Sequence, residues 1–89
     1  MEMNVTFEIW RKGNYYVAKC QELDFISQGR TAEEAKRNLL EVIDIHFEEM
    51  TEMGTLDDYL SECGYIRKQQ TFIPQIEMIS LEKHAVQVA

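Results

Sequence analysis

The spacing of apolar residues changes near residue 30, and this change limits the fold more than any other feature of the chain. Residues 4–10 alternate strictly between apolar and polar side chains, with Val5, Phe7 and Ile9 on one side. From Ala35 to Met53 the apolar residues instead recur at every third or fourth position. Alternation predicts a half-buried strand, and the longer spacing predicts a helix with one apolar face. The chain is therefore expected to pack a helix against a sheet in an α+β fold.

Three segments before residue 30 predict an antiparallel meander. The first strand is expected at 4–10 and the second at 15–20, which is rich in aromatic and β-branched residues. Gly13 and Asn14 lie between them, and both tolerate the positive φ that a tight reversal needs. A third strand is expected at 25–28, after a polar link at 21–24, and it ends at Gly29.

A long helix is expected to follow the meander and to cover one face of it. Thr31 is the candidate N-cap, Glu34 completes a capping box, and Gly54 ends the helix. The apolar stripe of this helix contains Ala35, Leu39, Val42, Ile43, His46, Met50 and Met53, widened to one side by Leu40 and Phe47. The residues expected to be buried between sheet and helix are Phe7, Val17, Leu39, Ile43 and Met50.

The last third of the chain predicts a short helix and a closing strand region. Thr55 is expected to cap the short helix, which ends at Gly64. Beyond Tyr65 the pattern is extended, strand-like at 75–82 and alternating at 84–88, so one or two closing strands are expected there. The expected fold is thus a three-stranded antiparallel meander, one long helix packed on one face, a short second helix and closing strands (βββααβ). Residues 1–89 are expected to form a single domain with a radius of gyration of about 12 Å.

Charge and hydropathy exclude several classes of function. The net charge is −7, and no lysine or arginine occurs between Glu41 and Glu62. Because non-specific nucleic-acid binding depends mainly on cations that neutralise phosphates, direct nucleic-acid binding is not expected, and an acidic surface suits a basic protein partner. The first ten residues contain no continuous apolar stretch, so neither a signal peptide nor a membrane span is expected, and we place the protein in the cytoplasm.

The residues that carry enzyme chemistry are present but are not arranged for it. Cys20 and Cys63 have no CxxC partner, which favours two free thiols acting as small buried hydrophobic residues. Together with His46 and His84 they lack the short spacings of structural zinc sites. The acidic residues do not converge as paired metal ions require, and no Gly-x-Ser-x-Gly elbow occurs. His46 lies on the apolar helix face, where a satisfied core histidine is expected. We therefore expect no catalysis, no metal and no cofactor.

Three passages of the chain resemble the amino-terminal domain of the HicB antitoxin family. They are YYVAKCQEL at 15–23, SQGRTAEEA at 27–35 and NLLE at 38–41. The resemblance covers somewhat over half of the chain, and its order and spacing carry it more than any single residue. At Gln21 the chain departs from the proline that family members often have before Glu-Leu. That departure bears on the shape of the 21–24 link.

The resemblance implies a partial ribonuclease-H-like fold and an inhibitory role. Members of this family bind a HicA toxin, a small basic ribonuclease, and silence its RNA cleavage by covering it. Many members continue into a ribbon-helix-helix or helix-turn-helix domain that binds operator DNA. Here 24 residues follow Tyr65, and they are strand-like and close to neutral. No separate DNA-binding domain is therefore expected.

The expected partner is a HicA-like toxin, recognised through carboxylates and an aromatic anchor. The candidate partner-binding residues are Trp10, Tyr16, Lys19, Glu22, Asp24, Glu41, Asp44 and Glu48. The resemblance gives most weight to the second strand and the link, with Tyr16, Glu22 and Asp24. Two alternatives stay open for the other residues. The helix carboxylates form either a solvated face or a toxin-facing one, and Trp10 is either exposed for a partner or covered by the closing strands or the short helix.

Self-association is also expected. A small α+β domain with wide apolar faces is a natural self-pairing unit, either through a sheet edge or through its aromatic face. We expect a homodimer or a tetramer. The alternative to a toxin inhibitor is a free-standing oligomeric scaffold that has the same fold and no toxin partner.

Overall fold

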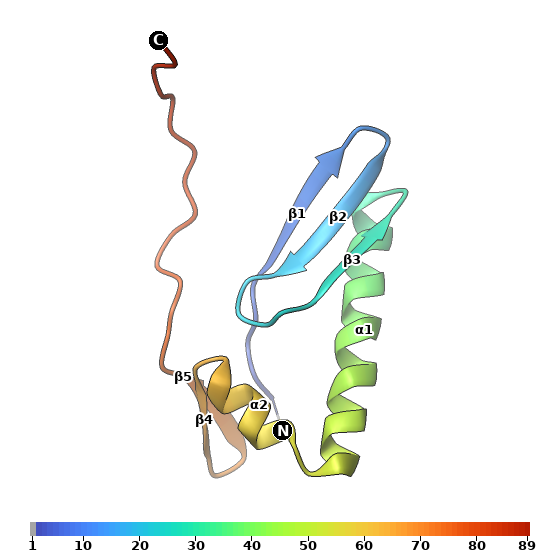
Figure 1. The fold of residues 1–89 in the computed structure, drawn as a ribbon, viewed down its shortest axis with the longest axis vertical. Helices are drawn as coiled ribbons and strands as arrows, with labels where there is room; N and C mark the ends of the chain where they lie inside the picture. Colours follow the sequence, from blue (N-terminus) through green and yellow to red (C-terminus); the bar gives the residue numbers. More distant parts are fainter. Residues whose placement is uncertain (1) are drawn as a thin grey trace.

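A computed structural model of the protein describes residues 2–89. Figure 1 shows three strands, a long helix, a short helix and a β-hairpin in chain order, so the fold is α+β with the order βββααββ. The elements are β1 (Phe7–Lys12), β2 (Tyr15–Cys20), β3 (Ile26–Gly29), α1 (Ala32–Met53), α2 (Leu56–Glu62), β4 (Tyr65–Lys68) and β5 (Thr71–Pro74).

The predicted antiparallel meander is confirmed, with the order β1-β2-β3 in one sheet. Lys12 pairs with Tyr15 across the two-residue turn at Gly13 and Asn14. Gly13 has a φ of 63°, whereas Asn14 has no positive φ, so only the first turn residue needs the left-handed region. A positive φ at the first central residue alone is the pattern of a type II′ turn.

The first strand begins later than its alternation predicts, at Phe7 and not at Asn4. At Thr6 the carbonyl still accepts a hydrogen bond from the amide of Gln21, at 2.8 Å. The amide of Thr6, however, donates to the carboxylate of Glu22, at 2.7 Å. A side chain has thus taken the place of a strand partner, and regular pairing starts one residue further on.

Helix α1 packs on one face of the meander, as expected. Thr31 caps it through a hydrogen bond from the amide of Glu34 at 3.0 Å, and Gly54 ends it with a φ of 73°. The core between helix, sheet and hairpin consists of Ala18, Cys20, Leu23, Ala35, Leu39, Ile43, Leu60, Tyr65 and Phe72. The prediction is confirmed for Leu39 and Ile43, which are 0% and 7% exposed.

The rest of the predicted core and helix stripe needs correction. Val17 is buried, but it lies on the sheet face away from α1, and Phe7 and Met50 are only half-buried. The stripe residues that the structure leaves exposed are Leu40, His46 and Met53. For His46 and Met53 the reason is length: the 22 residues of α1 span roughly 33 Å, whereas strands of four to six residues span only about 13–20 Å. The last turns of α1 therefore extend past the sheet. Leu40 lies earlier in the helix, at the side of the apolar stripe, and is 50% exposed.

Below the sheet, α2 and the β4–β5 hairpin close the core. The residues that α2 and the hairpin contribute to the core are Leu60, Tyr65 and Phe72. Gly64 has a φ of 95°, as predicted for the residue that follows a helix, whereas the predicted cap Thr55 makes no side-chain hydrogen bond to α2. The hairpin forms a two-stranded sheet of its own, next to the chain start, where Glu2 bridges to Thr71.

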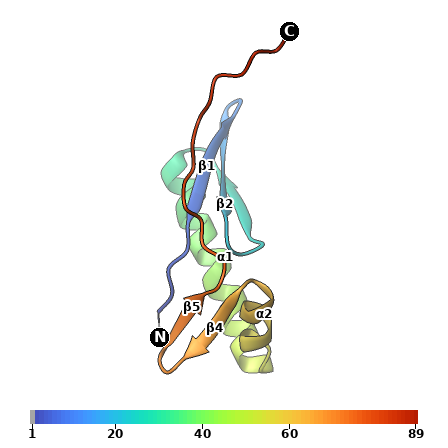
Figure 2. The same ribbon diagram turned by 90° about the vertical axis from the view of Figure 1, so that its left-hand side faces the viewer.

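Residues 75–89, which we call the C-terminal arm, contain no strand. The closing strands lie at 65–74, and the strands expected within 75–88 are wrong for the chain as described, because an alternating segment forms a strand only beside a partner. Figures 1 and 2 show the arm rising from β5 along the β1 side of the molecule and apart from it. The arm makes the molecule 49 Å long and raises the radius of gyration to 15.5 Å, above the compact value expected from chain length.

In the described part of the chain, neither helix has the length and apolar character that a membrane crossing would require.

Candidate partner-binding surface

No element within residues 2–89 forms a second layer over one face of the meander, and we call this face the open sheet face. The strand register places eight side chains on the open sheet face, on the side of the sheet opposite α1. They are Glu8, Trp10, Lys12, Tyr15, Val17, Lys19, Ile26 and Gln28. Trp10 lies opposite Val17, and Glu8 lies opposite Lys19. The structure thus brings two of the predicted site residues, Trp10 and Lys19, onto one surface.

Large apolar side chains stand exposed on the open sheet face. Trp10 is 56% exposed, Ile26 62% and Tyr15 42%. Between them Val17 is 8% exposed, because its neighbours on the three strands cover it. Two shallow hollows of about 400 and 360 Å³ share Lys12, Val17 and Ile26, and Trp10 and Lys19 line the larger one. Clustered exposed apolar residues of this kind are typical of protein-binding surfaces.

The alternative left open for Trp10 is decided by the position of the hairpin. The closing strands and α2 lie below the sheet, beside the end of α1 and the chain start, and not over the open face (Figure 1). Trp10 therefore keeps more than half of its surface in solvent.

Tyr16 lies on the opposite side of the sheet from Trp10. It pairs with Arg11 and Gly29, is half-buried and packs against the core under α1. Tyr16 and Trp10 thus do not form one aromatic surface, although both were grouped as partner-binding candidates from the sequence.

Glu22 forms part of the fold. Its Oε1 accepts the Thr6 amide at 2.7 Å, and its Oε2 accepts the Thr6 hydroxyl at 2.8 Å. The Cys20 thiol also points at Oε1, at 3.8 Å, and burial raises the pKa of that thiol. Glu22 therefore ties the start of the chain to the end of β2. Its half-buried carboxylate is already occupied within the protein.

Asp24 differs from Glu22, although both belong to the 21–24 link. Its side chain is exposed and receives no hydrogen bond within residues 2–89, whereas its amide donates to the hydroxyl of Tyr59 at 3.3 Å. Burial raises the pKa of Tyr59 to about 12, so this hydroxyl stays neutral. Of the two link carboxylates, Asp24 is the one available to a partner.

The predicted helix carboxylates stand on the outer side of α1. Glu41, Asp44 and Glu48 are all exposed, and within residues 2–89 none of them forms an ion pair. Leu40 and Ile45 accompany them, 50% and 48% exposed. The eight predicted site residues are thus divided among the open sheet face, the link, the helix side and, for Tyr16, the sheet–helix interface.

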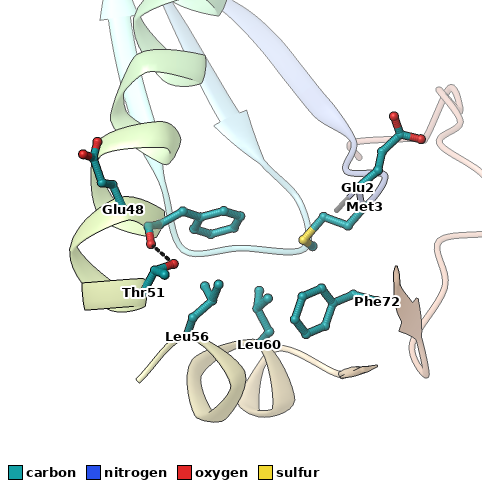
Figure 3. A pocket seen from close by; sticks show the side chains of 8 residues that line it. Glu2, Met3, Glu48, Thr51, Leu56, Leu60 and Phe72 are labelled. Carbon is teal, nitrogen blue, oxygen red and sulfur yellow. Dashed lines mark hydrogen bonds between the residues drawn. The ribbon is translucent and has the colours of Figure 1, made fainter. Parts of the chain in front are cut away.

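A separate hollow of about 220 Å³ lies between α1, α2, β5 and the chain start. Figure 3 shows Met3, Leu56, Leu60 and Phe72 pointing into it. The carboxylates of Glu2 and Glu48 point away from it, and the Thr51 hydroxyl donates to the Phe47 carbonyl at 2.7 Å. The hollow is therefore apolar inside, with no base facing a nucleophile.

Within residues 2–89, the structure assembles no group of three or more potential metal ligands. Cys20 and Cys63 are free thiols, Cys20 buried and Cys63 half-buried. Burial raises the pKa of the Cys63 thiol, which keeps it in its less reactive protonated form. His46 is exposed, against the prediction of a core histidine. Its Nδ1 lies 2.9 Å from the Val42 carbonyl and its ring lies 5.0 Å from that of Phe25.

The residues that carry the family resemblance hold β3 to α1. A Cβ on Gly29 would lie 2.7 Å from the Ala35 amide nitrogen, so this close approach requires glycine. Thr31 and Glu34 form the first half of the predicted capping box, because the Thr31 hydroxyl accepts from the Glu34 amide at 3.0 Å; the Glu34 carboxylate accepts from the amide of Arg30, one residue before the N-cap, at 3.2 Å. Asn38 donates to the Gln28 carbonyl at 2.9 Å. Residues 27–38 of the motif therefore specify a junction in the fold, and this part of the motif contains none of the candidate partner-binding residues.

Comparisons with models of protein families, with curated proteins and with solved structures find no match to this chain.

Reasoning from the sequence missed six residues of the open sheet face: Glu8, Lys12, Tyr15, Val17, Ile26 and Gln28. A usable signal was present in the turn. A two-residue turn at Gly13 and Asn14 makes Lys12 and Tyr15 partners, and this places Trp10 opposite Val17. The position of Ile26 depended on the pairing of β2 with β3, which the 21–24 link does not specify.

Proposed function

We propose that this protein is an antitoxin that binds and masks a small basic ribonuclease of the HicA type, and that it acts by binding alone. The observation that carries the proposal is the open sheet face, where Trp10, Tyr15 and Ile26 are exposed on a rigid sheet. Exposed aromatic side chains fixed on strands are typical binding anchors, since little conformational freedom is lost when a partner covers them.

The fold also supports the proposal. The family resemblance implies a meander followed by a long helix, and the chain has this order, with the family-like passage 27–35 at the junction of β3 and α1. A helix covers one side of the sheet and leaves the other free, so the domain offers a flat surface to a partner. Among residues 2–89, those that line the apolar hollow between α1, α2 and β5 include no arrangement of acid and base for catalysis.

Charge provides the attraction to a basic partner. The chain has a net charge of −7, and the carboxylates of Glu41, Asp44 and Glu48 are exposed without a cationic partner in the described chain. Exposed charges mainly accelerate encounter, and buried apolar contacts mainly slow dissociation. We therefore assign steering to the helix side and anchoring to the open sheet face, where Trp10 lines a hollow together with Lys12 and Lys19.

The experiment uses the full chain together with the product of the adjacent reading frame. Co-expression and size-exclusion chromatography measure complex formation, and a fluorescent RNA substrate measures inhibition. Trp10→Ala tests the anchor, and the matched pair Glu41→Lys with Glu48→Lys tests the helix side. Asp24→Lys tests the link without disturbing Glu22, which belongs to the fold.

We expect Trp10→Ala to raise Kd by about thirtyfold or more, mostly through faster dissociation, as for an anchor worth about 2 kcal/mol. The helix pair should mainly slow association and reduce its salt dependence. If the helix pair or Asp24→Lys abolishes inhibition while Trp10→Ala does not, the anchoring surface is assigned wrongly. If no basic ribonuclease binds, the antitoxin proposal is wrong and a free-standing scaffold is favoured.

A further inference from the structure

The outer edge of β1 has unpaired backbone groups at three positions. Thr6 and Gln21 form a hydrogen-bonded pair, and the hydrogen-bonded pairs of an antiparallel ladder alternate. The register of β1 with β2 therefore turns the even-numbered residues of β1 toward β2. The amides and carbonyls of Phe7, Ile9 and Arg11 point outward, away from the sheet.

The other edge of the sheet, at β3, is protected. The Cys20 amide donates to the Phe25 carbonyl, so Cys20 and Phe25 form a hydrogen-bonded pair. Because such pairs alternate, the amides and carbonyls of Ile26 and Gln28 point outward from β3. The side chain of Asn38 on α1 covers this edge by donating to the Gln28 carbonyl at 2.9 Å. Within residues 2–89, the β3 edge thus has a contact from α1 at the Gln28 carbonyl, whereas the outward groups of β1 have no such contact, and Ile9 and Trp10 on this strand are 38% and 56% exposed.

The C-terminal arm is fixed at its root and free beyond it. The Gln75 amide donates to the Gly64 carbonyl at 2.6 Å, and Met78, 38% exposed, still lines a hollow beside Asn4. Further along, Ile79 is 87% exposed and Val88 94%. In the described chain, every side-chain hydrogen bond of residues 79–89 joins two residues of that segment.

The free part of the arm has the composition of a strand. Its exposed apolar residues are separated by one residue in two pairs, Ile79 with Leu81 and Val86 with Val88. Such alternation places both members of a pair on one side of an extended segment. A solvent-exposed segment of this kind is unfavourable unless a neighbouring strand and apolar surface receive it.

We propose that the C-terminal arm of one molecule pairs with the free β1 edge of a second copy, and that two molecules exchange arms in this way. The occupant is a second copy because each chain provides one arm and one free edge, so a two-fold dimer satisfies both at once. This dimer uses the edge of the sheet and leaves the open sheet face available, so it goes beyond the proposed masking function.

Strand direction also favours exchange over pairing within one chain. The arm runs in the same direction as β1 of its own molecule (Figure 1), so pairing within the chain would be parallel. Parallel pairs are less stable and occur mainly in sheets covered on both faces, whereas this sheet is covered on one. A second molecule related by a two-fold axis can present β1 in the antiparallel direction.

The test combines sedimentation equilibrium at tens of micromolar with hydrogen exchange of backbone amides. For the full chain we expect twice the 10.5 kDa monomer mass, and slow exchange at the amides of Phe7, Ile9 and Arg11. A chain ending at Met78 should sediment at its own monomer mass, which is below the 10.5 kDa of the full-length monomer, and should lose protection at these three amides, while Leu39 keeps its protection.

Matched arm variants separate pairing from folding. Val86→Ser with Val88→Ser removes one apolar pair, and the control Ala85→Ser with Gln87→Ser changes the same segment on its other side. We expect the first variant to shift toward the monomer mass and the control to remain dimeric. Ile9→Pro removes one outward amide, which β1–β2 pairing does not use, and should also yield monomer.

Three results would overturn the proposal. Protected β1 amides in a monomer would show that the arm pairs within its own chain. A full chain that is monomeric with unprotected β1 amides would show that the arm has no partner among copies of this protein. A truncated chain that stays dimeric would place the interface elsewhere. None of these outcomes depends on whether a ribonuclease binds, so the masking function is tested separately.

Discussion

The two faces of the same three-stranded sheet differ in almost every respect. On the face under α1, Ala18 and Cys20 are fully buried and pack against Ala35 and Leu39. On the open sheet face, Lys19, between Ala18 and Cys20 in the chain, is exposed, and Trp10 keeps over half of its surface in solvent. Neighbouring residues thus have opposite roles. The closed face contributes buried apolar contacts to the stability of the fold, whereas the open face has large apolar side chains exposed to solvent.

The largest effect should come from the helix side of the closed face. Leu39→Ala removes a fully buried side chain and should lower the free energy of unfolding by about 2–5 kcal/mol. The neighbouring position provides the control, since Leu40 is half exposed. Leu40→Ala should change the free energy of unfolding by less than about 1 kcal/mol. Urea denaturation followed by circular dichroism measures both. Equal midpoints for the two variants would show that the buried helix face is assigned wrongly.

An intermediate loss of stability is expected at one of two adjacent residues of β2. Ala18→Leu adds volume to a position with no exposed surface and should cost about 1–3 kcal/mol. Lys19→Leu places the same side chain on the open sheet face and should alter stability by no more than about 0.5 kcal/mol. The expected pattern is a lower urea midpoint for the first variant alone. A comparable loss for the second would mean that the open face is covered in the folded protein.

The 21–24 link allows a buried and an exposed residue to be compared outside the sheet. Glu22→Ala leaves the half-buried Thr6 amide without its acceptor and should cost about 1–3 kcal/mol, whereas Asp24→Ala should be nearly neutral. Hydrogen exchange at the Thr6 amide should accelerate only in the first variant. If Glu22→Ala is as stable as the unaltered chain, the link does not depend on the contact with Thr6.

The smallest effect is a dependence of stability on alkaline pH. Burial raises the pKa of Tyr65 to about 12, above its usual value of about 10, and its hydroxyl donates to the Asn4 carbonyl at 3.0 Å. Above about pH 10 the unfolded chain loses this proton while the folded chain keeps it, so the free energy of unfolding falls as the pH rises toward 12.

Tyr65→Phe checks the origin of this fall. The variant should lose about 0.5–1.5 kcal/mol at neutral pH through the missing hydrogen bond. Its stability should then decline less steeply between pH 10 and 12, with Tyr59 contributing the remainder. Thermal unfolding at several pH values measures both. An unchanged slope would assign the alkaline loss to other groups.

Much of the fold was predictable from local sequence. The alternation before residue 30, the glycine at the first turn, the Thr31 N-cap and the glycines that end both helices each act over a few residues, and all have the predicted place. The predicted α+β order is confirmed for the same reason. The ends of β1 and the exposure of the last turns of α1 were not predictable, because they depend on Glu22 and on the lengths of the strands that the helix meets.

The candidate site was less predictable than the fold. Trp10 and Lys19 share a surface, but Tyr16 faces the core and Glu22 is bonded to Thr6. A residue type and its distance along the chain predict that a side chain can bind a partner, but not which side of a sheet it lies on. That depends on register, and a shift of one residue would move every side chain of a strand to the other face.

The sequence by itself determined the order of the elements, the capped ends of the long helix and the acidic character of the molecule, since these depend on local conformational preferences and composition. Only the tertiary structure decided which sheet face α1 covers, which carboxylates stay free and which strand edge remains unpaired. These properties depend on contacts between residues far apart in the chain, such as Asn38 with Gln28 and Tyr65 with Asn4. Burial of apolar area selects among such contacts for the whole molecule at once, so no local segment specifies them.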